Sequence, residues 1–104
     1  MGTGGYDPDL FDAAEFGDLE YARMLLGGPG VDGEPIDVDA RDTEGVTILM
    51  LASYYGHAEI VRLILDHGAD PNLRDRRGRT ALMRAESGGH TQVVAMLRQS
   101  GANG

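Results

Sequence analysis

The chain has 104 residues, enough for one compact domain with a modest core. Its 17 acidic and 9 basic residues give a formal net charge of −8, which argues against a surface that binds nucleic acid or an anionic membrane. It has no cysteine, so disulfides and Cys-ligated metal centres are excluded.

The chain opens on Met-Gly-Thr-Gly-Gly, which predicts a flexible lead over residues 1–8. No basic segment followed by an apolar run opens the sequence, and no apolar run approaches the length of a membrane span. We therefore expect a non-secreted, cytoplasmic protein with no membrane partner.

A repeat of 33 residues organises the rest of the chain. Residues 42–74 and 75–104 match at this shift, and a weaker copy over residues 9–41 contains a glycine-rich insertion at 27–35. The matched pairs are Gly45 and Gly78, Thr47 and Thr80, Leu49 and Leu82, Ala52 and Ala85, Gly56 and Gly89, His57 and His90, Val61 and Val94, and Gly68 and Gly101. We expect one domain of three repeats over residues 9–104.

Each copy reads as two short helices, at residues 9–16, 19–26, 48–55, 58–66, 81–88 and 91–99. In the middle copy, Thr47 can cap the first helix and Gly68 can end the second one. We expect Leu51 and Ile64 to face both neighbouring copies. Since neither helix could bury its apolar face alone, the pattern predicts an all-α solenoid of helix-turn-helix units.

The motifs G-x-T-x-L-x-x-A, G-H-x-x-x-V and G-A-D-x-N resemble the ankyrin repeat over residues 9–103. The resemblance implies an L-shaped stack of helix pairs, with β-turn fingers projecting to one side. It also implies protein recognition through the fingertips and the inner helices. The family's usual T-P-L-H appears here as Thr47-Ile48-Leu49-Met50, without the helix-starting proline. We expect some loss of stability but the same fold.

Charged residues replace apolar ones in the two outer copies. Asp12 and Arg84 stand where the middle copy has Leu51, and Arg98 stands where it has Leu65. Because terminal repeats need a soluble outer face, we expect these charges to face solvent. The pattern then reads as an N-terminal cap, one full repeat and a C-terminal cap, a complete short array that we expect to be monomeric.

No constellation of catalytic or metal-ligating residues is recognisable. The histidines lack metal-cluster spacing, and we expect His57 and His90 to serve local structure at the start of a helix. The acidic residues of the first finger lack a calcium-loop pattern. The glycine-rich stretch at 27–35 lacks the lysine of a phosphate loop, because all nine basic residues are arginines. We expect no cofactor and no metal, and an enzyme or nucleotide binder is the least favoured function.

Charge is distributed unevenly along the chain. Residues 1–44 hold twelve acids and two arginines, whereas residues 45–104 hold five acids and seven arginines. Four of these arginines fall on or beside the finger that opens the third repeat. They form either a solvated loop or a cluster for an acidic partner surface, through bidentate carboxylate contacts.

Tyr54 and Tyr55 follow an inner helix, and Phe16 takes the matching place in the first copy. Tyrosine and arginine are typical interface anchors, although one tyrosine could instead pack as core. At the family's variable positions, the resemblance implies partner contacts by Arg41, Thr43, Glu44, Val46, Tyr54, Tyr55, Arg74, Arg76, Arg77, Arg79 and Ser87. We expect an adaptor or inhibitor that binds a protein; an engineered ankyrin binder is the alternative.

Overall fold

The computed structural model describes residues 8–27 and 37–102, which form six helices and no strand. The helices are α1 (Pro8–Phe16), α2 (Leu19–Gly27), α3 (Ile48–Tyr55), α4 (Ala58–Asp66), α5 (Ala81–Ser87) and α6 (Thr91–Gln99). Every predicted helix is present, and each end lies within one residue of its prediction. Pro8, expected in the lead, begins α1, and Gly27, expected in the insertion, ends α2. The rest of the lead and of the insertion lies outside the described residues.

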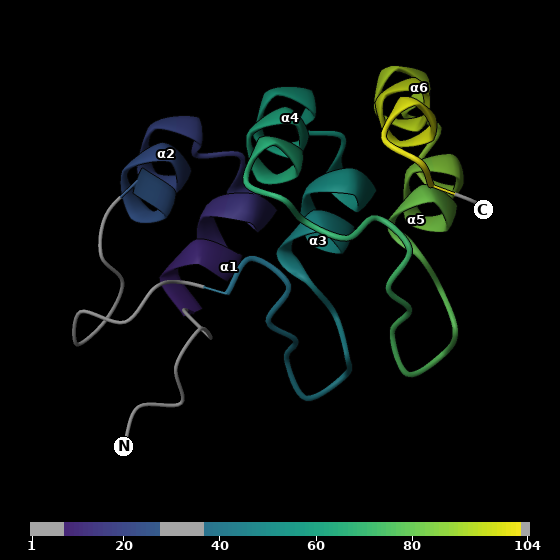
Figure 1. The fold of residues 1–104 in the computed structure, drawn as a ribbon, viewed down its shortest axis with the longest axis horizontal. Helices are drawn as coiled ribbons and strands as arrows, with labels where there is room; N and C mark the ends of the chain where they lie inside the picture. Colours follow the sequence, from purple (N-terminus) through teal and green to yellow (C-terminus); the bar gives the residue numbers. More distant parts are fainter. Residues whose placement is uncertain (1–7, 28–36, 103–104) are drawn as a thin grey trace.

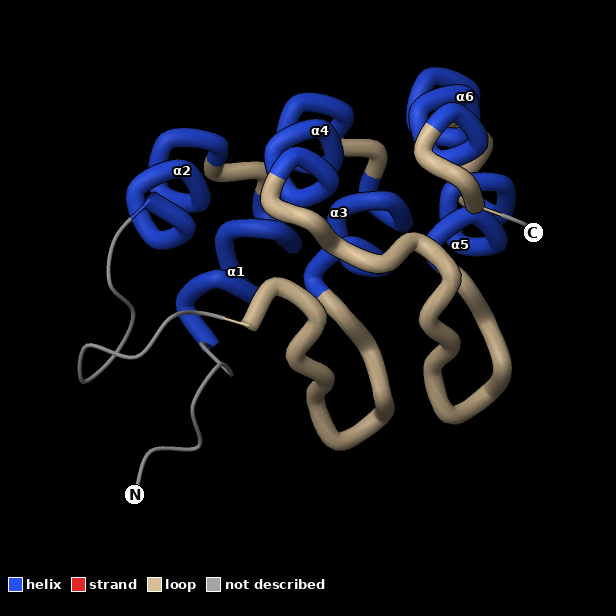
Figure 2. Tube along the Cα trace, viewed as in Figure 1, coloured by secondary structure: helices blue, strands red, loops and turns tan. Residues whose placement is uncertain are grey.

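The helices form two rows (Figure 1). Helices α1, α3 and α5 form the inner row, and α2, α4 and α6 form the outer row above it. Two loops extend from the inner row as fingers, the first within residues 37–47 and the second within residues 70–80 (Figure 2). The main helix contacts join helices of one repeat or of adjacent repeats. This nearest-neighbour packing confirms the predicted all-α solenoid.

Each finger is a tight turn that begins with an aspartate. Gly45 and Gly78 lie in the two turns with φ of 78° and 77°, a conformation that side chains disfavour. The Asp42 carboxylate accepts a hydrogen bond from the Glu44 backbone N–H at 2.8 Å. The backbone N–H of Arg76 donates to the carbonyl oxygen of Glu44 at 3.0 Å, so the two fingers are joined directly. The two glycines are one of the pairs that match at the 33-residue shift.

The inner helices start at the threonines that the repeat places there. Thr47 Oγ1 accepts a hydrogen bond from the Met50 N–H at 3.2 Å, and Thr80 Oγ1 accepts one from the Met83 N–H at 3.2 Å. Each bond satisfies a backbone donor of the first helical turn that would otherwise lack a partner. The predicted cap is therefore confirmed, and it forms without the family's usual proline.

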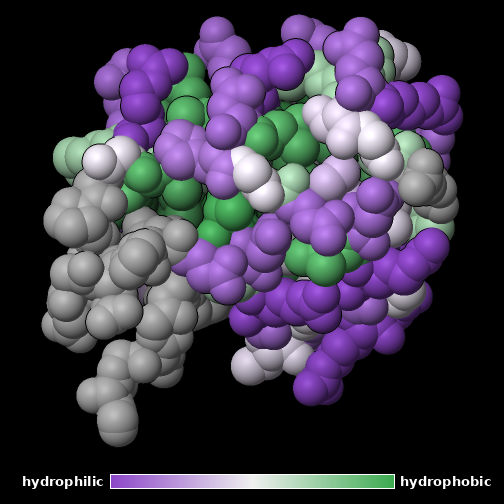
Figure 3. Space-filling view, in the orientation of Figure 1, coloured by the Kyte–Doolittle hydropathy of each residue, from purple (hydrophilic) through white to green (hydrophobic). Residues whose placement is uncertain are grey.

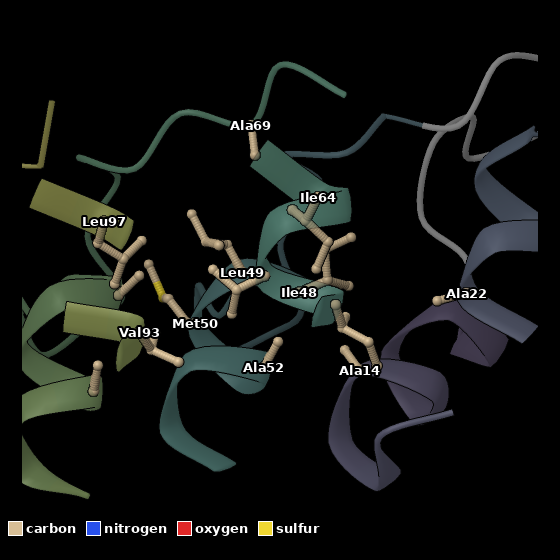
Figure 4. Close-up of a cluster of buried hydrophobic side chains, with 14 of the residues drawn as sticks. Ala14, Ala22, Ile48, Leu49, Met50, Ala52, Ile64, Ala69, Val93 and Leu97 are labelled. Atoms are coloured by element: carbon tan, nitrogen blue, oxygen red, sulfur yellow. The ribbon is translucent and has the colours of Figure 1, made fainter. Parts of the chain in front are cut away.

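The core runs through all three repeats (Figure 4). Leu49 and Ile64 are each 1% exposed, which confirms the expected burial of Ile64. Leu51 was also expected at the centre, but it is only half-buried. Successive helical residues turn by about 100°, so residues two apart project in widely different directions. Because Leu49 faces the core, Leu51 is turned toward its margin.

His57 and His90 join adjacent repeats. Neither ring caps the helix that follows it. Instead, Nε2 of His57 donates to the carbonyl oxygen of Glu15 at 3.0 Å, and Nε2 of His90 donates to that of Tyr54 at 2.9 Å. The His57 ring fits because Gly17 has no side chain, since a Cβ there would lie 2.7 Å from it. The expected local role was too narrow, because these rings link one repeat to the next.

Candidate functional site

The second finger is built around a buried carboxylate. The Asp75 side chain is 2% exposed. Its Oδ1 accepts hydrogen bonds from the backbone N–H groups of Arg77 and Arg79, both at 2.9 Å. Its Oδ2 accepts from Nε of Arg79 at 3.1 Å and from Nη2 of Arg84 at 2.7 Å. Two of the arginines that the sequence concentrates in this region are therefore bound to Asp75.

These contacts keep Asp75 charged. Burial opposes its ionisation, but the Arg79 N–H, the Arg84 guanidinium and the other donors outweigh burial and lower the pKa of Asp75 to about 2. Arg84 in turn is only 11% exposed. Its expected solvent-facing position is wrong, because Asp75 provides a buried charge partner. In the middle repeat, the equivalents of Asp75 and Arg84 are Asp42 and the apolar Leu51.

The other charges expected at the ends of the array do face solvent. Asp12 is exposed on α1. Arg98 on α6 pairs with Glu86 on α5 at 3.1 Å, and their side chains are 62% and 46% exposed. An ion pair this exposed contributes little to stability, about 0–1 kcal/mol.

The four arginines predicted on the second finger are not equivalent. Nη1 of Arg74 donates to the carbonyl oxygen of Gly78 at 2.7 Å and so supports the turn. Arg79 is bound to the buried carboxylate described above. Arg76 and Arg77 are exposed, and no hydrogen bond or ion pair engages either side chain within residues 8–27 and 37–102. The positive charge available to a partner on this finger is therefore concentrated at Arg76 and Arg77.

The remaining candidates of the fingers and of α5 lie at the surface, with one exception. Arg41, Thr43 and Glu44 are exposed on the first finger, and Ser87 is exposed at the end of α5. Val46 is 8% exposed and belongs to the core cluster. Its predicted role as a contact residue is wrong, because its side chain is packed inside the protein.

Tyr54 and Tyr55 end α3 with side chains in solvent. They are 43% and 44% exposed, so neither is a core residue. Their rings meet edge to face with centroids 4.9 Å apart, and the Tyr55 ring stacks on His57 with centroids 6.2 Å apart. The first finger leads into the opposite end of α3. This helix of eight residues is about 12 Å long, at 1.5 Å per residue. The tyrosines therefore lie together, but a helix length from the base of the first finger.

Phe16 is an exposed aromatic residue, but it is not among the contact residues predicted from the sequence. At the end of α1 it is 74% exposed, more than any other large apolar residue described. The repeat alignment already matched it to Tyr55, so that alignment was the signal that could have identified it. By contrast, mainly hydrophilic side chains cover the lower edge of the molecule where the fingers project (Figure 3).

The outer row carries an open groove of about 370 Å³. Its lining includes Arg23, Glu59 and Arg62, with Leu19 and Met96 among its apolar residues. Among the residues described, no group of three or more histidines and carboxylates could hold a metal ion. No helix in the described stretches has the length and apolar character needed to cross a membrane.

A sequence model described as ankyrin repeats, in three copies, matches residues 10–104. Ankyrin repeat domain-containing protein 29 of Homo sapiens is 43% identical over 63 residues, which are 61% of this chain and 19% of that protein. Cyclin-dependent kinase 4 inhibitor B of Bos taurus is 38% identical over 72 residues, which are 69% of this chain and 50% of that protein.

A solved structure is also similar. It comes from a complex of a predatory endopeptidase of Bdellovibrio bacteriovorus with an immunity protein. The TM-score is 0.84 at 33% identity, and the match covers 93% of this chain and 48% of that chain. This chain thus spans half or less of the length of these three proteins. With three matched copies and the observed stack of helix pairs, the chain belongs to the ankyrin-repeat family.

Proposed function

We propose that this chain is a non-catalytic module that binds a partner protein through its fingers and inner row of helices. The binding face comprises Arg41, Thr43, Glu44, Tyr54, Tyr55, Arg74, Arg76, Arg77, Arg79 and Ser87. The observation that carries the proposal is the pair of exposed tyrosine rings at the end of α3. Large aromatic side chains left in solvent are typical of surfaces that a partner covers.

The tyrosines are suited to anchor a partner because they are already ordered. The Tyr55 ring lies between the edge contact with Tyr54 and the stacking contact with His57. The same His57 is held by the carbonyl oxygen of Glu15. Ring positions that are fixed before binding reduce the entropy lost on association. We therefore assign most of the binding energy to these two side chains.

Arg76 and Arg77 have a different role in this proposal, because exposed ion pairs each contribute only about 0–1 kcal/mol. Their charges favour encounter with an acidic surface on the partner, an effect that salt weakens. The backbone bond between Arg76 and Glu44 supports this finger against its neighbour. The two arginines thus contribute mainly to the rate of association.

The names of the similar proteins support an inhibitor or adaptor role. One is an inhibitor of a cyclin-dependent kinase, and the solved structure contains an endopeptidase and an immunity protein. We propose that this chain acts likewise by covering a protein surface, as a cytoplasmic monomer without cofactor or metal. Its net charge of −8 supports a protein partner over nucleic acid or an anionic membrane.

The experiment begins with capture of a partner from the source cell and its identification by mass spectrometry. Association and dissociation rates are then measured by surface plasmon resonance at low and high salt. Tyr54→Ala should dissociate about 30-fold faster, the effect of losing about 2 kcal/mol at a hot spot. The double reversal Arg76→Glu and Arg77→Glu should slow association, most strongly at low salt.

The matched control is the double reversal Arg23→Glu and Arg62→Glu on the outer row, which makes the same change in net charge. It should slow association much less than the finger reversal. If the tyrosine variant and the finger reversal both bind like the parent, the partner binds elsewhere and the proposed face is refuted.

A further inference from the structure

We propose that the first repeat docks an arginine-bearing segment of the partner protein, on a surface formed by Phe16 and Asp12 of α1. The inference rests on the proposed function, because it adds a second end, of opposite charge, to the same binding face. Phe16 is its central residue and is 74% exposed. A phenyl ring this exposed offers one face or edge to a partner.

Asp12 lies one helical turn before Phe16 on α1. The two residues are four apart on α1, a spacing that places side chains on the same helix face with Cβ atoms about 5–6 Å apart. Both are exposed, whereas the buried residues of α1 are Leu10, Phe11, Ala13 and Ala14. No hydrogen bond or ion pair engages the Asp12 carboxylate within the described stretches. An aromatic ring and an available carboxylate are therefore neighbours on one surface.

The end of α1 is linked to the tyrosine pair through His57. That histidine bonds to the carbonyl oxygen of Glu15, the residue before Phe16, at 3.0 Å. The Tyr55 ring stacks on the ring of the same histidine, with centroids 6.2 Å apart. Phe16 thus follows directly after the residue that His57 links to the tyrosines of the proposed binding face.

The charge of the first repeat determines which kind of partner segment can bind this surface. Residues 8–27 and 37–44 carry nine acids and two arginines. A cation approaching α1 is therefore attracted, whereas an acidic segment is repelled. A guanidinium can stack on an aromatic ring while it donates hydrogen bonds to a carboxylate, which an apolar side chain cannot do. An arginine side chain therefore matches both groups that α1 presents.

The opposite charges of the first repeat and the second finger also determine the orientation of the bound partner. Arg76 and Arg77 at the second finger favour acidic groups, and Asp12 on the first repeat favours basic ones. A partner with both charges docks with its basic segment over α1 and its acidic segment over the second finger. The reverse orientation would bring like charges together, which disfavours it.

The test uses a fluorescein-labelled peptide of ten arginines, with binding to the whole chain measured by fluorescence anisotropy at low salt. Phe16→Leu keeps an apolar side chain but removes the aromatic ring, and it should weaken binding about two- to fivefold. Phe16→Tyr keeps a ring and should bind like the parent. Asp12→Asn should also weaken binding by about two- to fivefold.

Two controls separate this surface from general attraction by an acidic protein. Met24→Ala removes another exposed apolar side chain, 63% exposed on α2, and should not alter binding. Asp66→Asn removes the same charge as Asp12→Asn, but from α4. All the variants change exposed residues, and circular dichroism melting verifies that each one folds.

Equal binding by Phe16→Leu and Met24→Ala overturns the proposal, and so does equal binding by Asp12→Asn and Asp66→Asn. The peptide assay needs no natural partner, so its outcome is distinct from that of the Tyr54 experiment. If Phe16 and Asp12 contribute while Tyr54→Ala and the finger reversal both bind the partner like the parent, the docking surface on α1 stands and the proposed binding face does not.

Discussion

The guanidinium of Arg84 lies 2.7 Å from the buried carboxylate of Asp75 and joins the second finger to helix α5. The first finger has the equivalent aspartate, Asp42, which accepts the same kind of backbone hydrogen bonds. At the place of Arg84, however, the middle repeat has Leu51. Two similar turns in one protein therefore differ by the side chains of Arg79 and Arg84, which both pair with Asp75, and each turn is a control for the other.

Replacing Asp75 by asparagine should cost far more stability than the same change at Asp42. Asp75→Asn leaves the guanidinium of Arg84 buried beside a neutral amide, and breaking such a buried pair costs about 3–5 kcal/mol. Asp42→Asn disturbs only hydrogen bonds to backbone N–H groups, worth about 1 kcal/mol. Urea denaturation of both variants measures the difference. Similar losses in the two variants would show that the ion pair contributes nothing.

The contribution of Asp75 should disappear in acid. Its pKa is about 2 in the folded protein, against an ordinary value of 3.8, so folding favours the ionised form. Because the folded pKa is the lower one, this stabilisation of about 2 kcal/mol is complete above pH 3.8 and is lost as the pH falls toward 2. The difference in the free energy of unfolding between parent and Asp75→Asn should therefore narrow by about 2 kcal/mol over that interval. A gap independent of pH would contradict the prediction.

Replacing Asp39 by asparagine should stabilise the protein. Burial, together with repulsion from Asp37 and Asp70, raises the pKa of Asp39, so its ionised form costs stability at neutral pH. That cost vanishes as the pH falls below the ordinary value of 3.8. Asparagine still accepts the Asp70 N–H, and the next repeat already has Asn72 at this place.

The melting temperature of Asp39→Asn should rise by roughly 2–4 °C at pH 7 and low salt, and should equal that of the parent below pH 3.8. Asp66→Asn, an exposed site on α4, is the control for net charge alone. An equal rise in that control would assign the effect to overall charge and not to the surroundings of Asp39.

Truncation of Leu49 should destabilise the protein more than truncation of Leu51. Leu49 is 1% exposed, and Leu→Ala changes in a core cost about 2–5 kcal/mol. Leu51 is half-buried, so Leu51→Ala should cost about half as much. Denaturation in urea ranks the two variants. The opposite order would mean that α3 is rotated from the orientation described.

The helices, their caps and the finger turns were predictable because each depends on residues close together in the chain. Thr47 bonds to an N–H three residues away, and Gly45 lies within the turn that it permits. Each of these signals also recurs at the 33-residue shift, so the prediction for one repeat supports the same prediction for the next. The existence of a stacked helical array follows from the same pattern, since single helix pairs cannot bury their apolar faces.

Contacts between repeats were decided only by the tertiary structure. A repeat alignment assigns Arg84 and Leu51 to the same position. It does not show that Arg84 forms an ion pair with Asp75. The alignment also places His57 at the start of a helix. It does not show that the His57 ring bonds to the carbonyl oxygen of Glu15, 42 residues earlier. In the same way, the sequence concentrates arginines near one finger, and only packing decides that Arg79 and Arg84 are bound internally while Arg76 and Arg77 remain available. Burial and charge pairing depend on the neighbour that folding brings to each side chain, and that neighbour lies outside any local pattern.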